Sequence, residues 1–258
     1  IDGIILDLRN NPGGLLEEAV KISDIFLPVK QKIVSTRGPS VSETHEAKKL
    51  FLGEYLEKIP LAVLINRGSA SASEIVAASL KQNGRAILIG ERSFGKGTIQ
   101  TLWDLRDGSG LKLTIGEYLT PFGNSIQNIG IEPSIALRPI YISQKSDNFK
   151  ERSNGLESES ELRFKLIEEN EIFRGPSNIK PISISYLIND KNKFNNSEIV
   201  NNQVTVEKLK SDIFIQTSVL ALKFKKIEKI NSDFKKYFSK LESEENKKIV
   251  KKLSEFGI

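Results

Sequence analysis

Hydrophobic and polar positions follow two different spacings in the first part of the chain. Residues 3–8, GIILDL, form a short apolar run that ends in the polar turn RNNPGG, and such a run is typical of a buried strand. In residues 15–27, LLEEAVKISDIFL, apolar residues recur every three or four positions, as they do on one face of a helix. The pattern therefore predicts a strand, a tight turn and a helix.

The same order of elements is repeated further along the chain. Residues 61–66, LAVLIN, predict a strand, the turn RGSA follows, and residues 71–82 have helical spacing. Asn83-Gly84 is expected to end this helix, because this pair supplies the left-handed residue that closes a helix C-terminus. Residues 85–90, RAILIG, predict the next strand. Two such units predict an α/β fold with a largely parallel sheet, whose ligands bind near the turns RNNPGG and RGSASAS.

Other patterns complete the first half of the chain. Residues 32–37 predict a strand, and residues 46–56 predict a helix. Residues 98–105 and 111–121 alternate as two strands joined by RDGSG, which indicates a hairpin. Residues 124–137 predict a closing loop and an edge strand.

The composition changes near Ser143, where SQKSDNFKERSNGLESESE is polar and rich in charge, as a linker is. Beyond it, residues 162–173 and the Lys-rich run from Val206 to the C-terminus predict helices. We therefore predict a first domain over residues 1–142 and a mainly helical extension over residues 143–258. This extension is expected to pack on the first domain or on another copy of the chain.

The overall composition indicates a globular protein. The chain has 258 residues, of which 38% are hydrophobic, and this is enough for one sizeable core. It begins at Ile1 and contains no methionine, so we expect it to be a piece of a longer protein. The net charge of +5 is small and interleaved, which favours a solvated surface and no nucleic-acid partner.

The chain contains no cysteine and one histidine, His45. Thiol nucleophiles, disulfides and the usual ligand set of a catalytic zinc are therefore excluded, and no metal or other cofactor is expected. His45 lies in the polar stretch SETHEAKK, which favours a solvated surface residue over a catalytic base.

Lys96 lies in GERSFGKGT, a stretch that is similar to a phosphate-binding loop. A Walker A loop requires serine or threonine directly after the lysine and a helix after that. Here Gly97 follows Lys96, and the next residues alternate as in a strand, so nucleotide binding is disfavoured. A lysine can instead act as a base when its amine is neutral, which burial next to a cavity favours.

Ser71 is the candidate nucleophile for such a base. It lies at the predicted start of a helix, where its hydroxyl can project into a cleft next to backbone amides. A structural alternative is that Ser71 and Glu74 match the capping box Ser-x-x-Glu. Likewise, Gly13 and Gly14 either permit a tight turn or contribute an amide to an oxyanion hole.

The motifs DLRNNPGG, NRGSASASEIVAASL, GERSFGKGTIQ and IGIEPSI occur in this order. Together they resemble the C-terminal processing peptidases, also called tail-specific proteases. The resemblance covers residues 1–137 and is specific because four separate motifs agree. It implies a ClpP/crotonase-like protease core that is incomplete at its N-terminus. The chain departs from the family pattern at Ser134, where the family usually has aspartate.

The resemblance implies a Ser/Lys dyad, in which the lysine lies 25 positions after the serine and a glutamine lies four positions after the lysine. These spacings fall on Ser71, Lys96 and Gln100. If residues from Lys96 onwards form a strand, Lys96 and Gln100 point to the same face, and Gln100 can then orient the amine. The resemblance thus implies a serine peptidase that forms an acyl-enzyme.

The implied oxyanion hole uses the amide of Ala72, directly after the nucleophile, and an amide of Gly13 or Gly14. The implied activity is that of an endopeptidase that cleaves protein or peptide substrates near their exposed C-termini. Members of the family also carry an upstream PDZ domain, which we do not find in this chain. The alternative function is therefore a non-catalytic fragment that binds peptides or acts as a scaffold.

Two further expectations come from the same resemblance. Family members carry a signal or a membrane anchor, which implies a periplasmic or otherwise extracytoplasmic location. Their C-terminal helices often contribute to dimers, so we expect a homo-oligomer through the extension over residues 143–258.

Overall fold

The computed structural model describes residues 1–39, 41–48, 55–141, 150–151, 182–188, 209 and 212–223. The larger of its two sheets is formed by β1 (Ile4–Asp7), β4 (Leu61–Ile65), β5 (Ile87–Gly90), β8 (Ile135–Tyr141), β9 (Lys150–Glu151) and β10 (Ile182–Ile188). The strand order is β1-β4-β5-β8-β10, all of these pairs are parallel, and β9 pairs antiparallel with β8. The prediction of a largely parallel sheet in an α/β fold is confirmed.

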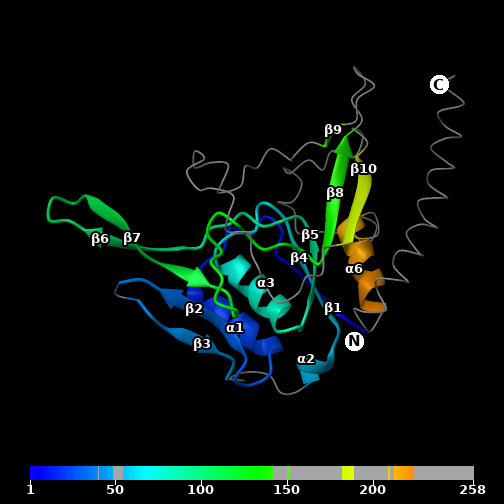
Figure 1. The fold of residues 1–258 in the computed structure, drawn as a ribbon, viewed down its shortest axis with the longest axis horizontal. Helices are drawn as coiled ribbons and strands as arrows, with labels where there is room; N and C mark the ends of the chain where they lie inside the picture. Colours follow the sequence, from blue (N-terminus) through cyan, green and yellow to red (C-terminus); the bar gives the residue numbers. More distant parts are fainter. Residues whose placement is uncertain are drawn as a thin grey trace, which may run out of the picture.

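The smaller sheet is antiparallel and has the order β3-β2-β7-β6. Its strands are β2 (Lys32–Arg37), β3 (Thr44–Glu46), β6 (Thr98–Asp104) and β7 (Gly110–Leu119), and the described helices are α1 (Leu16–Phe26), α2 (Tyr55–Lys58), α3 (Ala72–Gln82) and α6 (Ile213–Lys223). The predicted hairpin is formed by β6 and β7, which extend away from the rest of the fold on the left of Figure 1. No described helix is long and apolar enough to cross a bilayer.

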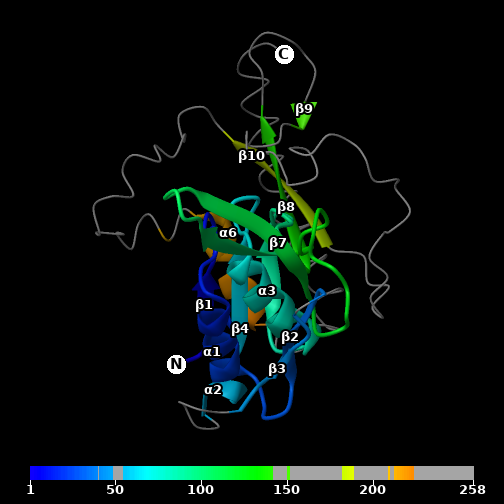
Figure 2. The same ribbon diagram turned by 90° about the vertical axis from the view of Figure 1, so that its left-hand side faces the viewer.

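Helices α1 and α3 lie side by side and pack on one face of the larger sheet, while α6 packs on the other face (Figures 1 and 2). The alternation of side chains along β4 explains this arrangement, because successive residues of a strand point to opposite faces. Val63 and Ile65 are buried with α1 and α3, whereas Ala62 and Leu64 are buried with α6. The fully apolar sequence of β4 therefore reflects burial on both faces.

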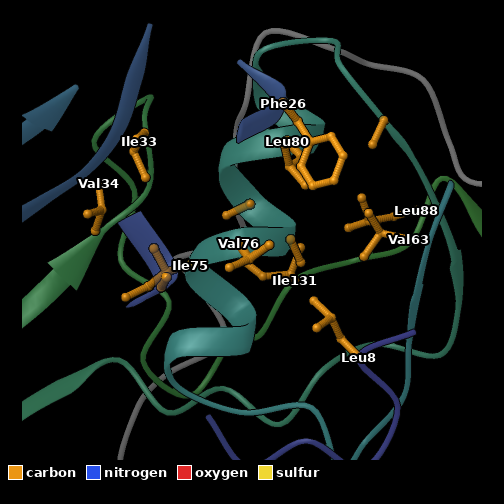
Figure 3. Close-up of a cluster of buried hydrophobic side chains, with 14 of the residues drawn as sticks. Leu8, Phe26, Ile33, Val34, Val63, Ile75, Val76, Leu80, Leu88 and Ile131 are labelled. Carbon is orange, nitrogen blue, oxygen red and sulfur yellow. The ribbon is translucent and has the colours of Figure 1, made fainter. Parts of the chain in front are cut away.

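Helix α3 is the centre of the larger apolar cluster (Figure 3). Its Ile75, Val76 and Leu80 are almost completely buried, among side chains from both sheets. The helix ends as predicted, because Gly84 has φ +66° and Arg85 N–H donates to the carbonyl of Leu80. Because α3 packs against α1 and against strands of both sheets, its first residue, Ala72, has a defined position relative to both sheets.

The prediction of a helix over residues 46–56 is wrong at its beginning. Glu46 ends β3, and Ala47 exchanges backbone hydrogen bonds with Lys30 and Gln31. The backbone N–H of the next residue, Lys48, donates to Asp24. These tertiary hydrogen bonds outweigh the local helix propensity. Only Tyr55–Lys58, as α2, is helical among the described residues of this segment, and residues 49–54 lie outside the described part.

The prediction of an edge strand within residues 124–137 is also wrong. β8 begins at Ile135 and lies inside the sheet, between β5 and β10. β10 pairs with β8 over seven residues, so the sheet continues past the predicted boundary at residue 142. Helix α6 lies in the run predicted to be helical after Val206, whereas residues 162–173 lie outside the described part.

Candidate active site

Ser71 lies at a sharp turn between β4 and α3. Its backbone has φ 56° and ψ −118°, a conformation that residues with a side chain rarely adopt. The structure over-determines this conformation through α3, which begins at the next residue, Ala72, and is almost completely buried. Strained residues of this kind are concentrated at functional sites, and a nucleophilic serine on a strand-to-helix turn is a recurrent example.

The turn RNNPGG lies directly against Ser71. A Cβ placed on Gly13 would lie 2.7 Å from the carbonyl oxygen of Ala70, 2.8 Å from the backbone nitrogen of Ala72 and 2.9 Å from Ser71 Cβ. Only glycine fits this position, which also has φ +101°. The structure therefore brings together the two turns that the sequence placed at one edge of the sheet.

Two asparagines join these turns. Asn10 and Asn66 pair through their side chains at 3.0 Å, and the backbone N–H of Asn10 donates to Asn66 Oδ1 at 2.9 Å. The backbone N–H of Ala70 donates to the carbonyl of Asn11 at 3.0 Å. Asn11 Oδ1 accepts a hydrogen bond from the backbone N–H of Gly13 at 3.0 Å. The turn is therefore held at a fixed distance from Ser71.

Glu74 connects the backbone of Ser71 to that of Lys96. Its Oε2 accepts hydrogen bonds from the backbone N–H of Ser71 at 2.8 Å and from that of Lys96 at 2.9 Å. Its Oε1 accepts from the hydroxyl of Ser93 at 2.5 Å and from the backbone N–H of Gly95 at 2.8 Å. One buried carboxylate thus fixes both members of the predicted dyad through their main chains.

The environment of Glu74 has opposing effects on its charge. Burial raises the pKa of Glu74 above its ordinary value, whereas the hydrogen bonds from Ser93, Gly95, Ser71 and Lys96 lower it, and burial has the larger effect. The carboxylate can be ionised in this apolar surrounding only because it has four donors.

Lys96 lies between two glycines that the fold requires. Gly95 has φ +95° and approaches the backbone of Gly130, and a Cβ on Gly97 would lie 2.6 Å from the backbone nitrogen of Gln127. The side chain of Gln127 also accepts from the backbone N–H of Gly97 at 2.8 Å. Gly97, which breaks the Walker A pattern, is therefore needed for this contact, and β6 follows it, as predicted, instead of a helix.

Gln100 is exposed and lies in β6, which begins at Thr98. Lys96 precedes this strand, so side-chain alternation relates Gln100 to Thr98 and does not extend to Lys96. His45 lies in β3 at the edge of the smaller sheet, with its Nε2 3.6 Å from Glu43. His45 is therefore in the smaller sheet, whereas the turn that carries Ser71 follows β4 of the larger sheet.

Sequence reasoning found Glu74 only as the partner of Ser71 in a capping box. The Glu74 half of that capping box is formed, because the backbone N–H of Ser71 donates to Glu74 Oε2, but this is one of the four hydrogen bonds that Glu74 accepts. Ser93 was not singled out, although its hydroxyl donates to Glu74 and accepts from the backbone N–H of Ile131 at 2.6 Å. The sequence feature that could have pointed to Ser93 is its position inside the motif GERSFGKGT, three residues before Lys96.

A serine held at a strained strand-to-helix turn, next to a glycine-rich turn, is typical of serine hydrolases. The profile of peptidase family S41 matches residues 1–137. The chain belongs to peptidase family S41.

Named relatives agree with this assignment. The chain is 50% identical over 139 residues to a carboxy-terminal-processing protease of Bartonella bacilliformis, a match that covers 53% of this chain and 31% of the relative. It is 40% identical over 154 residues to the carboxy-terminal processing protease CtpB of Bacillus subtilis, covering 58% and 31%. Among solved structures, the photosystem II D1 C-terminal processing protease matches with 39% identity and a TM-score of 0.49, covering 53% of this chain and 34% of that one. The chain thus spans about a third of the length of these relatives.

Proposed function

We propose that this chain carries the catalytic centre of a serine endopeptidase that cleaves protein substrates near their C-termini. The observation that carries the proposal is the shared carboxylate of Glu74, which binds the main chains of Ser71 and Lys96 at 2.8 and 2.9 Å. Membership of family S41 and relatives named carboxy-terminal-processing proteases support the same chemistry and substrate class.

In the proposed reaction, the neutral amine of Lys96 accepts the hydroxyl proton of Ser71 while Ser71 Oγ attacks the carbonyl carbon of a peptide bond. The tetrahedral intermediate collapses, the C–N bond breaks, and Lys96 gives its proton to the leaving amine. A water molecule then transfers a proton to Lys96 and attacks the acyl-enzyme, and this second intermediate collapses with return of the proton to Ser71. The cycle consumes one water and leaves the dyad unchanged.

The oxyanion of each intermediate is assigned to the backbone N–H of Ala72 and to an amide of Gly13 or Gly14. The close approach of Gly13 to Ser71 and Ala72 supports this role for the turn. In the structure the N–H of Gly13 donates to Asn11, so Gly13 can bind the oxyanion only if Asn11 releases or shares it. Gln100 is proposed to orient the amine of Lys96 once substrate is bound.

Several properties of the whole protein are proposed with this activity. Substrates are proteins or peptides with an exposed C-terminus, selected with the help of a PDZ domain elsewhere in the protein. The protein acts outside the cytoplasm, and bacterial and chloroplastic relatives are consistent with such a location. Residues 1–142 are proposed as the protease core, and the C-terminal extension is proposed to form homo-oligomers.

The test is covalent labelling of the purified chain with a serine-reactive phosphonate, followed by mass spectrometry. We expect one adduct on Ser71, which Ser71→Ala abolishes and Lys96→Ala reduces by about 10³-fold or more. Ser109→Ala and Lys112→Ala change the same residue types on the exposed β6–β7 hairpin and should label as the native chain does. Native labelling of both Ser71→Ala and Lys96→Ala would contradict the proposal.

The alternative is a peptide-binding or scaffold fragment without turnover. It is favoured by one observation: the backbone N–H of Gly13 donates to Asn11 Oδ1 at 3.0 Å, so in the structure this amide is not available to an oxyanion. Binding of a peptide with a free C-terminal carboxylate, together with no labelling of Ser71, would support this alternative over the peptidase.

A further inference from the structure

Helix α6 lies far along the chain from the four family motifs, yet it contacts the first residue of the turn RNNPGG. Arg9 donates to Asp7 through its Nε at 2.9 Å and its Nη2 at 2.6 Å. Its Nη1 lies 2.8 Å from Asp212 Oδ2, and its Cζ lies 4.9 Å from the centre of the Phe214 ring. The guanidinium is therefore held by two carboxylates and one aromatic face.

Asp212 links this contact to the start of α6. Its Oδ1 accepts from the backbone N–H of Phe214 at 2.9 Å, which caps the helix, while its Oδ2 binds Arg9. The side chains of Arg9 and Asp212 are only 22% and 15% exposed. An ion pair shielded in this way is screened less by solvent than a surface pair, so the helix start and Arg9 are expected to keep one relative position.

Phe214 extends the contact to the segment that leads to Lys96. A Cβ on Gly90 would lie 3.0 Å from Cε1 of the Phe214 ring. Gly90 is the last residue of β5, and the loop that follows it contains Lys96. The same ring is buried with Ala62 and Leu64 on the face of the sheet opposite α3. Phe214 thus contacts both Arg9 and Gly90, the residue after which the loop with Lys96 begins.

We propose that Asp212 and Phe214 are positioning residues at the start of α6. Through Arg9 they fix the turn RNNPGG, and through Gly90 they fix the loop that contains Lys96. Arg9 is four residues from Gly13, which lies against Ser71. A displacement of Arg9 therefore changes the distance between the oxyanion amides and the nucleophile. This inference rests on the proposed function, because it assigns α6 a role in the same site.

Two substitutions of Asp212 separate its two roles, which are the cap of α6 and the ion pair with Arg9. Asn caps a helix as well as Asp does, so Asp212→Asn keeps the cap of α6 and removes the charge that faces Arg9. Asp212→Glu keeps the charge and is the poorer cap. We expect Asp212→Asn to lower the maximal rate of phosphonate labelling roughly 10- to 100-fold, with an unchanged concentration for half-maximal rate. Asp212→Glu should recover most of this rate.

The experiment includes two more variants, a second test variant, Phe214→Leu, and a control, Glu18→Gln. Phe214→Leu keeps an apolar side chain on Gly90 but loses the aromatic face under Arg9, so it should slow labelling even if Asp212→Asn folds poorly. Glu18 forms an exposed pair with Lys21 on α1, and Glu18→Gln should label as the native chain does. Native labelling rates in both Asp212→Asn and Phe214→Leu would overturn the inference.

Hydrogen exchange gives a readout that does not depend on catalysis. The backbone amides of residues 10–14 should exchange faster in Asp212→Asn than in the native chain, while the amides of α3 should be unchanged. If the native chain does not label at all, the proposed function fails and the exchange rates alone decide the inference. Equal exchange of residues 10–14 in the two proteins would then refute it.

Discussion

Replacement of Gly13 by alanine tests whether the turn RNNPGG must lie against the proposed nucleophile, Ser71. The new Cβ would lie 2.7 Å from Ala70 O, 2.8 Å from Ala72 N and 2.9 Å from Ser71 Cβ. These atoms belong to the backbone of the turn around Ser71 and to its Cβ, so no flexible side chain can rotate away. The substitution must therefore move the turn RNNPGG away from Ser71.

The expected magnitude follows from two contributions. A left-handed conformation costs a residue with a Cβ about 1–2 kcal/mol, and overpacking a tight site costs about 1–3 kcal/mol. Gly13→Ala should therefore lower the free energy of unfolding by roughly 2–5 kcal/mol. To reach ordinary contact distance, the turn must also move by roughly half an ångström, and loss of one oxyanion donor slows acylation by about 10²–10³.

The assay combines denaturant unfolding with the rate of phosphonate labelling at Ser71. Gly108→Ala is the control for backbone strain, because Gly108 has φ +82° and no atom near its Cβ position. Gly108→Ala should label at the native rate. If Gly13→Ala also labels at the native rate, the turn does not form part of the oxyanion hole.

Four other substitutions have defined outcomes. Burial raises the pKa of Glu74 despite its four hydrogen bonds, so the folded state binds this proton more tightly than the unfolded chain does. Native stability should then fall as pH rises from about 4.5 to the folded pKa and stay level above it. Unfolding at several pH values should show that Glu74→Gln lacks this fall, and a pH-independent difference between the two proteins would contradict the reasoning. Gly90→Ala should lower stability by about 3 kcal/mol or more, because φ is +131° and its Cβ would meet backbone and the Phe214 ring. Gly123→Ala, at φ +80° with open space, should cost only about 1–2 kcal/mol in the same denaturant titration, and equal losses would refute this account. Ser93→Ala should cost about 1–3 kcal/mol and slow labelling, because Glu74 loses a donor and a buried amide loses its acceptor; native values of both would show that this hydroxyl is dispensable.

Local sequence patterns predict those helices and strands in which nearly every residue is buried. The strand and helix around Ser71 were predicted within a residue or two, because β4 is apolar on both faces and α3 has a clear C-terminal glycine. Glu46 was assigned to a helix because its neighbours have helical spacing. Its actual place in β3 depends on pairing with Lys32, a long-range contact that local periodicity does not contain.

Spacing and resemblance predict Ser71 and Lys96 as site residues, which stays a prediction. The structure shows that their main chains are joined by one carboxylate, that of Glu74. The four-donor environment of Glu74 could not be predicted, because its donors come from residues 19 to 22 positions away as well as from Ser71. The contact of Arg9 with Asp212 joins residues even further apart in the sequence, and no motif contains both.

The late position of α6 in the sequence has a consequence for the order in which the protein is made. β4 and β5 are complete at residue 90, whereas α6 begins at Ile213, about 120 residues later. At roughly 5–20 residues per second, a ribosome needs about 6–25 s to synthesise this interval. During that time the turn at Ser71 exists, but Ala62, Leu64 and Ile89, which α6 covers in the finished fold, have no such cover. A nascent chain therefore exposes this apolar face until residues 213–223 are made, and the contact of Arg9 with Asp212 also forms only then.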